Sequence, residues 1–180
     1  MDRTEYERIA SEYLDMVYKI ALNYTGKSED ADDVVQQTFY KLLAVKKAFA
    51  NEEHIKRWLI RVCINECNSL FSGFWRKNVH FFSESSSESE AGVAAGEVHT
   101  ALLQEDPMFA EQERKALYEA VKKLPSKCRI VTYLFYYEGY KTQEIAQILH
   151  MRDATVRTRL VRARKLLKEE LKEAWEYEKS

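Results

Sequence analysis

The chain has 180 residues, with 28 Lys and Arg against 29 Asp and Glu, which gives a formal net charge of -1. That length has room for one domain or two small ones. Three cysteines and the absence of a long apolar run argue against a disulfide-rich secreted domain and against a membrane-spanning segment, so we expect a reduced, cytoplasmic protein.

The near-neutral charge hides an uneven distribution. Residues 1–82 carry 12 basic and 12 acidic side chains, residues 83–106 carry six acidic and no basic ones, and residues 107–180 carry 16 basic and 11 acidic ones. The middle stretch is rich in serine and poor in bulky apolar residues, as flexible linkers are. We therefore predict two folded parts, residues 1–78 and 107–180, joined by an acidic linker over residues 79–106.

The first part is predicted to form three helices. Apolar residues recur at helical spacing over residues 3–24, and Gly26 is expected to end that helix. A second helix is predicted from Ser28, because acidic residues crowd its positively polarised first turn. A third is predicted from Asn51 to Phe71. Their expected core residues are Tyr6, Ile9, Tyr13, Val17, Ile20, Tyr24, Ala31, Val34, Val35, Phe39, Leu42, Ile55, Leu59, Val62 and Cys63.

The second predicted helix carries a polar face opposite its apolar one. Asp33, Gln36, Gln37 and Lys41 occupy much of that face and make it rich in hydrogen-bonding groups. It is either a plain solvent face or a surface that binds another protein.

Large rings and basic side chains gather after Leu70. The sequence FSGFWRKNVHFF places Trp75 beside Arg76 and Lys77, and Arg61 precedes them on the third helix. Rings that stack on bases, beside cations that hold phosphates, are typical of single-stranded DNA binding. The alternative is that these rings close the core of the helical domain.

No enzyme site is apparent in the sequence. Cys63 and Cys67 lie four residues apart on one helix face, but no further metal ligands lie nearby, so core packing is the preferred interpretation. We find no catalytic set of nucleophile and base and no phosphate-binding glycine loop. We expect neither a metal nor a cofactor.

The second part is also predicted to be helical, which makes the fold class all-α. Helices are expected over residues 108–124 and 127–138, with Gly139 as a stop. A helix-turn-helix is then expected over residues 142–167. Thr142 and Asp153 stand where helix N-caps belong. The three residues from His150 to Arg152 form the turn.

The last helix has a basic face that suits the major groove of DNA. If its apolar residues point inward, the other face carries Arg157, Thr158, Val161, Arg162 and Lys165. Arginine binds guanine and phosphate in a bidentate manner, and one helix fits the major groove. The alternative is a solvated amphipathic helix without a DNA partner.

Several segments resemble one known family. DADDVVQQTFYKL at residues 30–42, HIKRWLIRVCINEC at residues 54–67, and the two C-terminal segments LPSKCRIVTYLFYYEGYKTQEIAQIL and TVRTRLVRARKLL look like bacterial sigma factors of the extracytoplasmic-function group. The resemblance covers about 150 positions. It implies a transcription initiation subunit with two domains.

The resemblance also implies roles for particular residues. Asp33, Gln36 and Gln37 would dock on the coiled coil of the largest RNA polymerase subunit, while the C-terminal part meets the flap region. The melted -10 promoter element would be held by Arg61, Asn65, Trp75, Arg76 and Lys77. The duplex -35 element would be read by Arg157, Thr158, Val161, Arg162 and Lys165. An anti-sigma factor is a further expected partner.

Two rival interpretations stay open at this point. A stand-alone regulator that binds operator DNA without polymerase would share the helix-turn-helix. A helical adaptor that binds only protein would explain the face around Asp33 but leave the basic helix without a role. The chain also departs from the family's usual pattern, because Gln37 and His150 replace an acid and a glycine.

Overall fold

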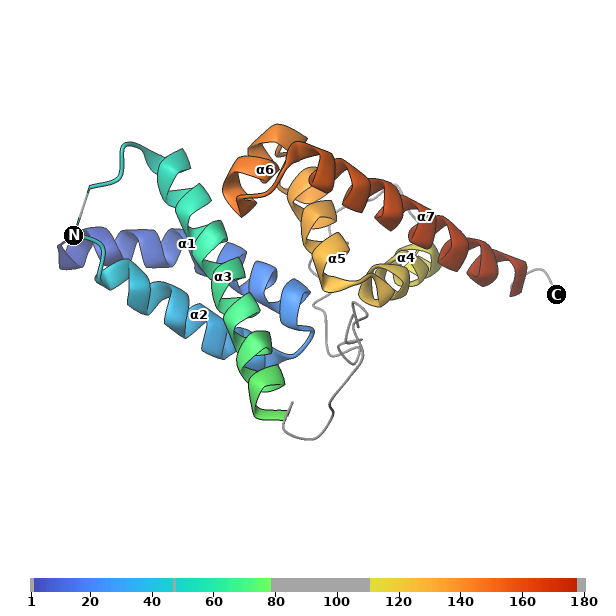
Figure 1. Cartoon of the computed structure of the whole chain (residues 1–180), viewed down its shortest axis with the longest axis horizontal. Coiled ribbons are helices and arrows are strands. Elements are labelled where there is room, and N and C mark those ends of the chain that lie inside the picture. Colours follow the sequence, from blue (N-terminus) through green and yellow to red (C-terminus); the bar gives the residue numbers. More distant parts are fainter. Residues whose placement is uncertain (1, 47, 79–110, 178–180) are drawn as a thin grey trace.

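The computed structural model of the chain describes residues 2–46, 48–78 and 111–177, with the side chains of residues 72–78, 111–114 and 173–177 left aside. The described ranges hold seven α-helices and one π-helical turn, and no strand (Figure 1). This confirms the all-α fold class. The linker predicted over residues 79–106 lies outside the described residues.

Helix α1 (Arg3–Thr25) follows the predicted range closely. The Asp2 carboxylate caps it by accepting the Glu5 backbone N–H at 2.7 Å. Gly26 ends it in the left-handed conformation, with φ of 75°, and donates its N–H to the Leu22 carbonyl, as helix-ending glycines do. Ile9, Val17 and Ile20 are fully buried on its inner face.

Helices α2 (Ser28–Leu43) and α3 (Glu52–Asn78) pack against α1 and complete an N-terminal three-helix bundle. α3 is longer than predicted, because it continues past Phe71 to Asn78. Trp75, Arg76 and Lys77 therefore lie on the last turns of a helix and not beyond its end. The helix continues through Gly73, because one internal glycine costs a helix only about 1 kcal/mol.

The C-terminal helices are α4 (Glu111–Lys123), α5 (Ser126–Thr132), α6 (Thr142–Leu149) and α7 (Asp153–Tyr177). The single regular helix predicted over residues 127–138 is wrong in its second half. There the chain winds as the π-helical turn η3 (Tyr133–Tyr137), before Gly139 ends it with φ of 73°. The Tyr140 backbone N–H reaches back to the Leu134 carbonyl at 3.0 Å.

The predicted caps of the helix-turn-helix are also wrong. Thr142 is the first residue of α6, and Lys141 occupies the cap position. The first turn is held instead by Glu144, whose carboxylate accepts the Lys141 backbone N–H at 2.9 Å. Asp153 begins α7 and forms an ion pair with Arg157 at 2.7 Å.

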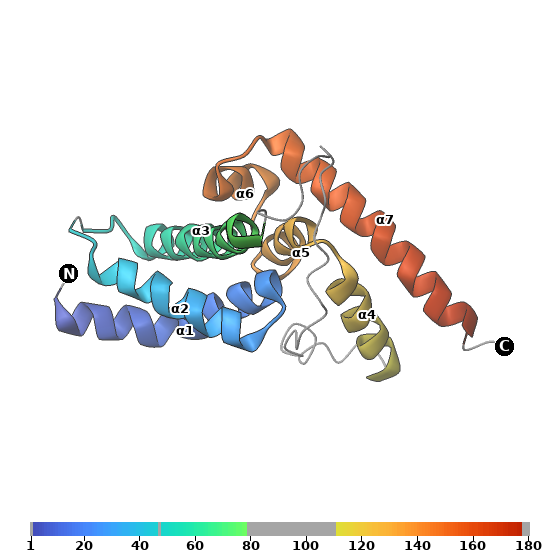
Figure 2. The ribbon, with the colours of Figure 1, turned by 60° about the horizontal axis from the view of Figure 1, so that its bottom comes forward.

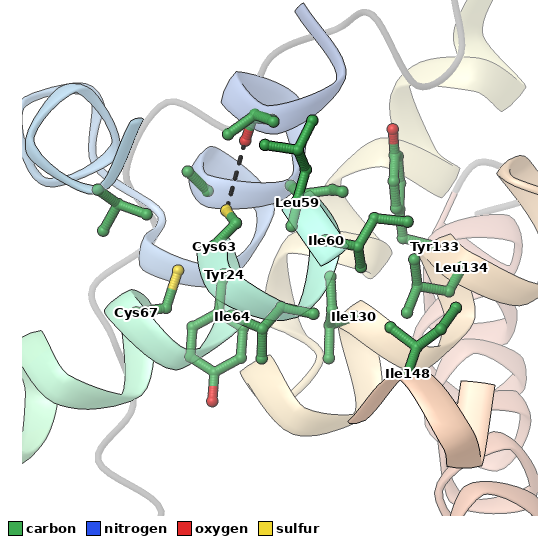
Figure 3. Close-up of a cluster of buried hydrophobic side chains, with 14 of the residues drawn as sticks. Tyr24, Leu59, Ile60, Cys63, Ile64, Cys67, Ile130, Tyr133, Leu134 and Ile148 are labelled. Atoms are coloured by element: carbon green, nitrogen blue, oxygen red, sulfur yellow. Dashed lines mark hydrogen bonds between the residues drawn. The ribbon is translucent and has the colours of Figure 1, made fainter. Parts of the chain in front are cut away.

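The N-terminal bundle and the C-terminal helices share one continuous apolar core. We call the part of this core where the two groups of helices meet the joint. α3 lies beside α6, and α1 lies beside α5 (Figures 1 and 2). Ile60 and Ile64 of α3 face the C-terminal group (Figure 3). Their counterparts there are Ile130, Tyr133, Leu134 and Ile148, all buried. Each buried isoleucine of this kind stabilises the packing by about 1.5–3 kcal/mol.

Candidate polymerase and nucleic-acid interfaces

The polar face of α2 points away from the core. Asp33, Gln36 and Gln37 are all exposed, while Val34 and Thr38 on the opposite face are buried. Tyr40 lies one turn further along the same face and is 68% exposed. A large exposed ring next to polar side chains that can donate and accept hydrogen bonds is suited to binding another protein.

The face of α3 that carries Arg61 and Asn65 is turned toward the C-terminal group. Both side chains line a cleft of about 120 Å³ at the joint. Opposite them, the cleft is closed by Lys127 of α5 and by Arg159 of α7. The structure thus brings two residues predicted to bind the -10 element into one site with cations from the other group.

Three other residues predicted to bind the -10 element, Trp75, Arg76 and Lys77, lie further along α3, and their side chains are outside the described ones. Their helical placement puts them about four turns beyond Arg61 along the same helix.

The outer face of α7 is open, as the sequence predicted. Arg157, Thr158, Val161, Arg162 and Lys165 are all exposed, and Val161 is 63% exposed although it is apolar. On the inner face, Val156, Leu160 and Ala163 are buried. α7 runs away from the N-terminal bundle in both views (Figures 1 and 2), so nothing described covers this face.

The turn that presents α7 has an unusual backbone. His150 ends α6 in the left-handed conformation, with φ of 52° and ψ of 46°, which is rare for a residue other than glycine. Its N–H still donates to the Ala146 carbonyl, so the turn closes as a glycine would close it.

Polar contacts that no sequence pattern indicated reinforce the joint. Lys56 Nζ lies 2.8 Å from Glu138 Oε2, whose side chain is only 10% exposed. Arg57 Nη2 lies 2.7 Å from Glu144 Oε1. Both cations also lie over the Tyr140 ring, at 5.5 and 5.7 Å from its centroid. Ion pairs between elements so far apart in sequence leave no periodic pattern to recognise.

The electrostatics of the joint follow from this packing. Burial raises the pKa of Tyr140, with Glu53 adding to the effect, and burial likewise raises the pKa of Tyr133, which donates to Glu138 at 2.9 Å. The hydrogen bond from the Lys141 backbone lowers the pKa of the Glu144 carboxyl, and Arg57 adds to this. Glu144 is therefore held as a carboxylate where Arg57 needs one.

The two predicted DNA-binding faces differ in their surroundings. Arg61 and Asn65 are exposed but line the cleft at the joint, whereas the outer face of α7 points into solvent along its length. Within the described ranges, no cluster of three or more metal-ligating side chains occurs, and none of the helices is long and apolar enough to cross a membrane.

Two family models match the chain in sequence. The model of sigma-70 region 2 matches residues 9–77, and the model of sigma-70 region 4 matches residues 114–167. These ranges contain the α2 and α3 faces and the helix-turn-helix respectively.

Similar whole proteins and a similar fold are also known. The chain is 24% identical over 172 residues to the ECF RNA polymerase sigma-E factor of Haemophilus influenzae, covering 94% of this chain and 89% of the relative. It is 27% identical to the RNA polymerase sigma factor SigV of Bacillus subtilis, covering 86% and 83%. The fold resembles that of the sigma factor RpoE in its complex with the anti-sigma factor NepR from Bartonella quintana, with a TM-score of 0.65, 24% identity and coverage of 93% and 97%.

Regions 2 and 4 therefore occur here in order along one helical chain. The sigma-E relative from Haemophilus influenzae and the relative SigW from Bacillus subtilis both carry the ECF designation. The chain belongs to the sigma-70 family of RNA polymerase sigma factors, within the extracytoplasmic-function (ECF) group.

Proposed function

We propose that this protein directs RNA polymerase core to specific promoters through three separate helical faces. The exposed face of α2, with Asp33, Gln36 and Gln37, docks on the coiled coil of the largest polymerase subunit. The observation that carries the proposal is that two sigma regions match in order and that each presents an exposed polar face on its own helix.

The DNA contacts divide between the two groups of helices. Arg61, Asn65, Trp75, Arg76 and Lys77 of α3 hold the melted -10 strand, where cations meet phosphates and rings stack on bases. Arg157, Thr158, Val161, Arg162 and Lys165 of α7 read the -35 duplex in the major groove. We assign residues 1–78 and 107–180 as the corresponding domains, with residues 79–106 as the linker between them.

Protein partners beyond the coiled coil follow from the same assignment. The C-terminal group meets the flap region of polymerase, which places the -35 reader at the correct distance upstream. The RpoE structure from Bartonella quintana contains an anti-sigma factor, and we propose a partner of that kind here. The protein acts in the cytoplasm as a non-enzymatic initiation factor and uses no cofactor.

A transcription assay with purified components tests this function. Core polymerase, this protein and a pool of DNA templates with randomised -35 and -10 elements are incubated, and the templates that yield transcripts are sequenced. We expect two enriched sequence blocks at fixed spacing, which appear only when both proteins are present. A stand-alone regulator would instead retain one duplex sequence without core, and that result would exclude the proposal.

A further inference from the structure

Three cations converge on the cleft at the joint without an acidic partner. Arg61 of α3 enters it from the N-terminal bundle, and Lys127 of α5 and Arg159 of α7 enter it from the C-terminal group. None of the three forms an ion pair with a described residue, and none of the described residues that line the cleft is acidic. Like charges facing each other repel, so this arrangement favours an anion between them.

The remaining lining residues complete an anion site of a particular kind. Asn65 and Asn68 add amide groups at the same wall. Tyr24 donates its hydroxyl proton to Asn68 Oδ1, which leaves the two N–H donors of that amide for another group. The Arg159 guanidinium donates one N–H to the weak acceptor Met151 Sδ, at 3.6 Å, and its other donors can bind a ligand.

The floor of the cleft is apolar. It is formed by Ile64, Ile130, Ile148, Leu149 and Met151. Arg61 and Lys127 are exposed and Arg159 is half-buried, so an anion can reach all three from solvent, while the apolar floor offers no competing acidic acceptor. Guanidinium groups with amide donors are the side chains that bind phosphate oxygens in proteins.

We propose that this cleft binds a small phosphate-bearing anion, held between Arg61 on one side and Lys127 and Arg159 on the other. Because its ligands come from both groups, the anion binds the closed arrangement and holds it closed. This consequence rests on the proposed function, since Arg61 and Asn65 are also assigned to the -10 strand. A bound anion then competes with promoter melting by occupying the same donors.

The anion site is tested on the free protein, without polymerase or promoter. Inorganic pyrophosphate is titrated at constant ionic strength, with sodium chloride as the compensating salt, and binding is followed by calorimetry and by melting temperature. We expect saturable binding and a rise in melting temperature. Each of the changes Lys127→Gln and Arg159→Gln should weaken binding by about tenfold or more, because each removes a charged hydrogen-bond donor.

Matched controls separate the site from general attraction to cations. Lys115→Gln on α4 removes an exposed lysine away from the cleft and should leave binding unchanged. The binding and melting data are independent of the transcription assay, so the sigma assignment and the anion site can fail separately. A response that follows ionic strength alone, or that survives both cleft substitutions together, overturns the anion site.

A last arm distinguishes the source of the phosphate. A single-stranded oligonucleotide, which offers only phosphodiesters, replaces pyrophosphate in the same titration. We expect pyrophosphate to raise the melting temperature and to displace the oligonucleotide. If the oligonucleotide alone binds and pyrophosphate does not, the cleft serves promoter DNA and the proposed small-anion site is wrong.

Discussion

Arg57 on α3 donates from Nη2 to Glu144 Oε1 on α6 at 2.7 Å, across 87 positions of sequence. The other oxygen of that carboxylate accepts the backbone N–H of Lys141, so α6 itself holds the group in place. Each side chain is about one third exposed, at 32% and 34%. An ion pair of that exposure contributes roughly 0.5–1 kcal/mol. The ion pair therefore helps to fix the orientation of α3 against α6, while apolar burial supplies most of the stability of the joint.

Charge reversal should raise the fraction of molecules in which the joint is open. Arg57→Glu places a third carboxylate beside Glu53 and Glu144, and like charges repel. With dyes on cysteines introduced at Ser11 and Gln147, both exposed, energy transfer should fall. The native cysteines are buried and stay unlabelled. The double change Arg57→Glu with Glu144→Arg should restore part of the transfer.

The matched control for this reversal is Arg3→Glu, which breaks the exposed pair with Glu7 on α1. It should leave energy transfer unchanged. If Arg57→Glu behaves like this control, the ion pair does not hold the joint.

The docking face of α2 should tolerate substitution without loss of stability. Asp33→Ala with Gln36→Ala removes exposed side chains that have no role in the core, so melting should stay within error. Affinity for polymerase core should drop by about tenfold or more, equivalent to about 1.4 kcal/mol. Size-exclusion or fluorescence binding measures this, with Glu7→Ala and Ser11→Ala on α1 as the matched control. Unchanged core affinity would remove α2 from the docking surface.

The recognition helix should separate base reading from phosphate binding. An arginine on a base edge discriminates by ~1–3 kcal/mol, whereas a phosphate contact weakens all sequences alike. Arg157→Ala and Arg162→Ala should relax the -35 preference in a randomised template pool. Lys168→Ala should lower the amount of transcript without changing the -35 preference. Arg157 must first leave Asp153, its partner at 2.7 Å in the free protein. If both arginine variants keep the original -35 preference, the proposed register of α7 on DNA is wrong.

Stability should fall as the pH rises above about 10. Burial raises the pKa of Tyr24 to about 12 and raises that of Tyr133 further, so both stay protonated in the folded state while an unfolded tyrosine ionises near 10. The folded state then binds more protons than the unfolded one, and each group costs up to about 1.4 kcal/mol per pH unit. Urea unfolding at pH 9, 10 and 11 measures the slope.

Two residues test the origin of this slope. Tyr133→Phe should make the loss shallower, because it removes one shifted phenol. Arg129 acts in the opposite direction: burial lowers its pKa to about 10 from 12.5, so the unfolded state binds the extra proton and stability gains between those values. A slope that is unchanged by Tyr133→Phe would assign the alkaline loss to other groups.

Arg129 itself is a site for stabilisation. Its side chain is 4% exposed, and its Nε–H has no hydrogen-bond partner among the described residues. Burying such a group without a partner costs about 1–3 kcal/mol. Arg129→Met keeps the length and removes the charge, so the free energy of unfolding at pH 7 should rise by about 1 kcal/mol. A clear loss of stability instead would mean that the guanidinium makes contacts that methionine cannot replace.

Periodicity carried most of the helix assignment, because each helix buries one stripe of apolar residues against its own group. The outer faces of α2 and α7 were predictable for the same reason, since Asp33 and Arg157 lie opposite those stripes. The joint was not predictable. Ile60 and Ile64 look like ordinary core residues of α3, and nothing in their spacing indicates that they meet Ile130 and Ile148.

The other wrong predictions, those of the helix caps and of the regular helix over residues 127–138, concern local hydrogen bonding. Side-chain caps were expected at Thr142 and Asp153, but Glu144 supplies the bond at α6, and Asp153 pairs with Arg157. The π-helical turn after Thr132 also has no signature in residue type. Lys127 and Arg159 were visible only as members of a basic segment, because the cleft that unites them exists only in three dimensions.

The mixed character of the joint makes it sensitive to temperature. Burial of Ile60, Ile64 and Ile148 stabilises less on cooling, because the entropic gain from releasing water shrinks. The desolvation cost of the pairs Lys56–Glu138 and Arg57–Glu144 is greatest in the cold as well. Both contributions weaken together, so cooling raises the fraction of molecules in which the joint is open. Warmth, within the range where the helices stay folded, keeps the joint closed.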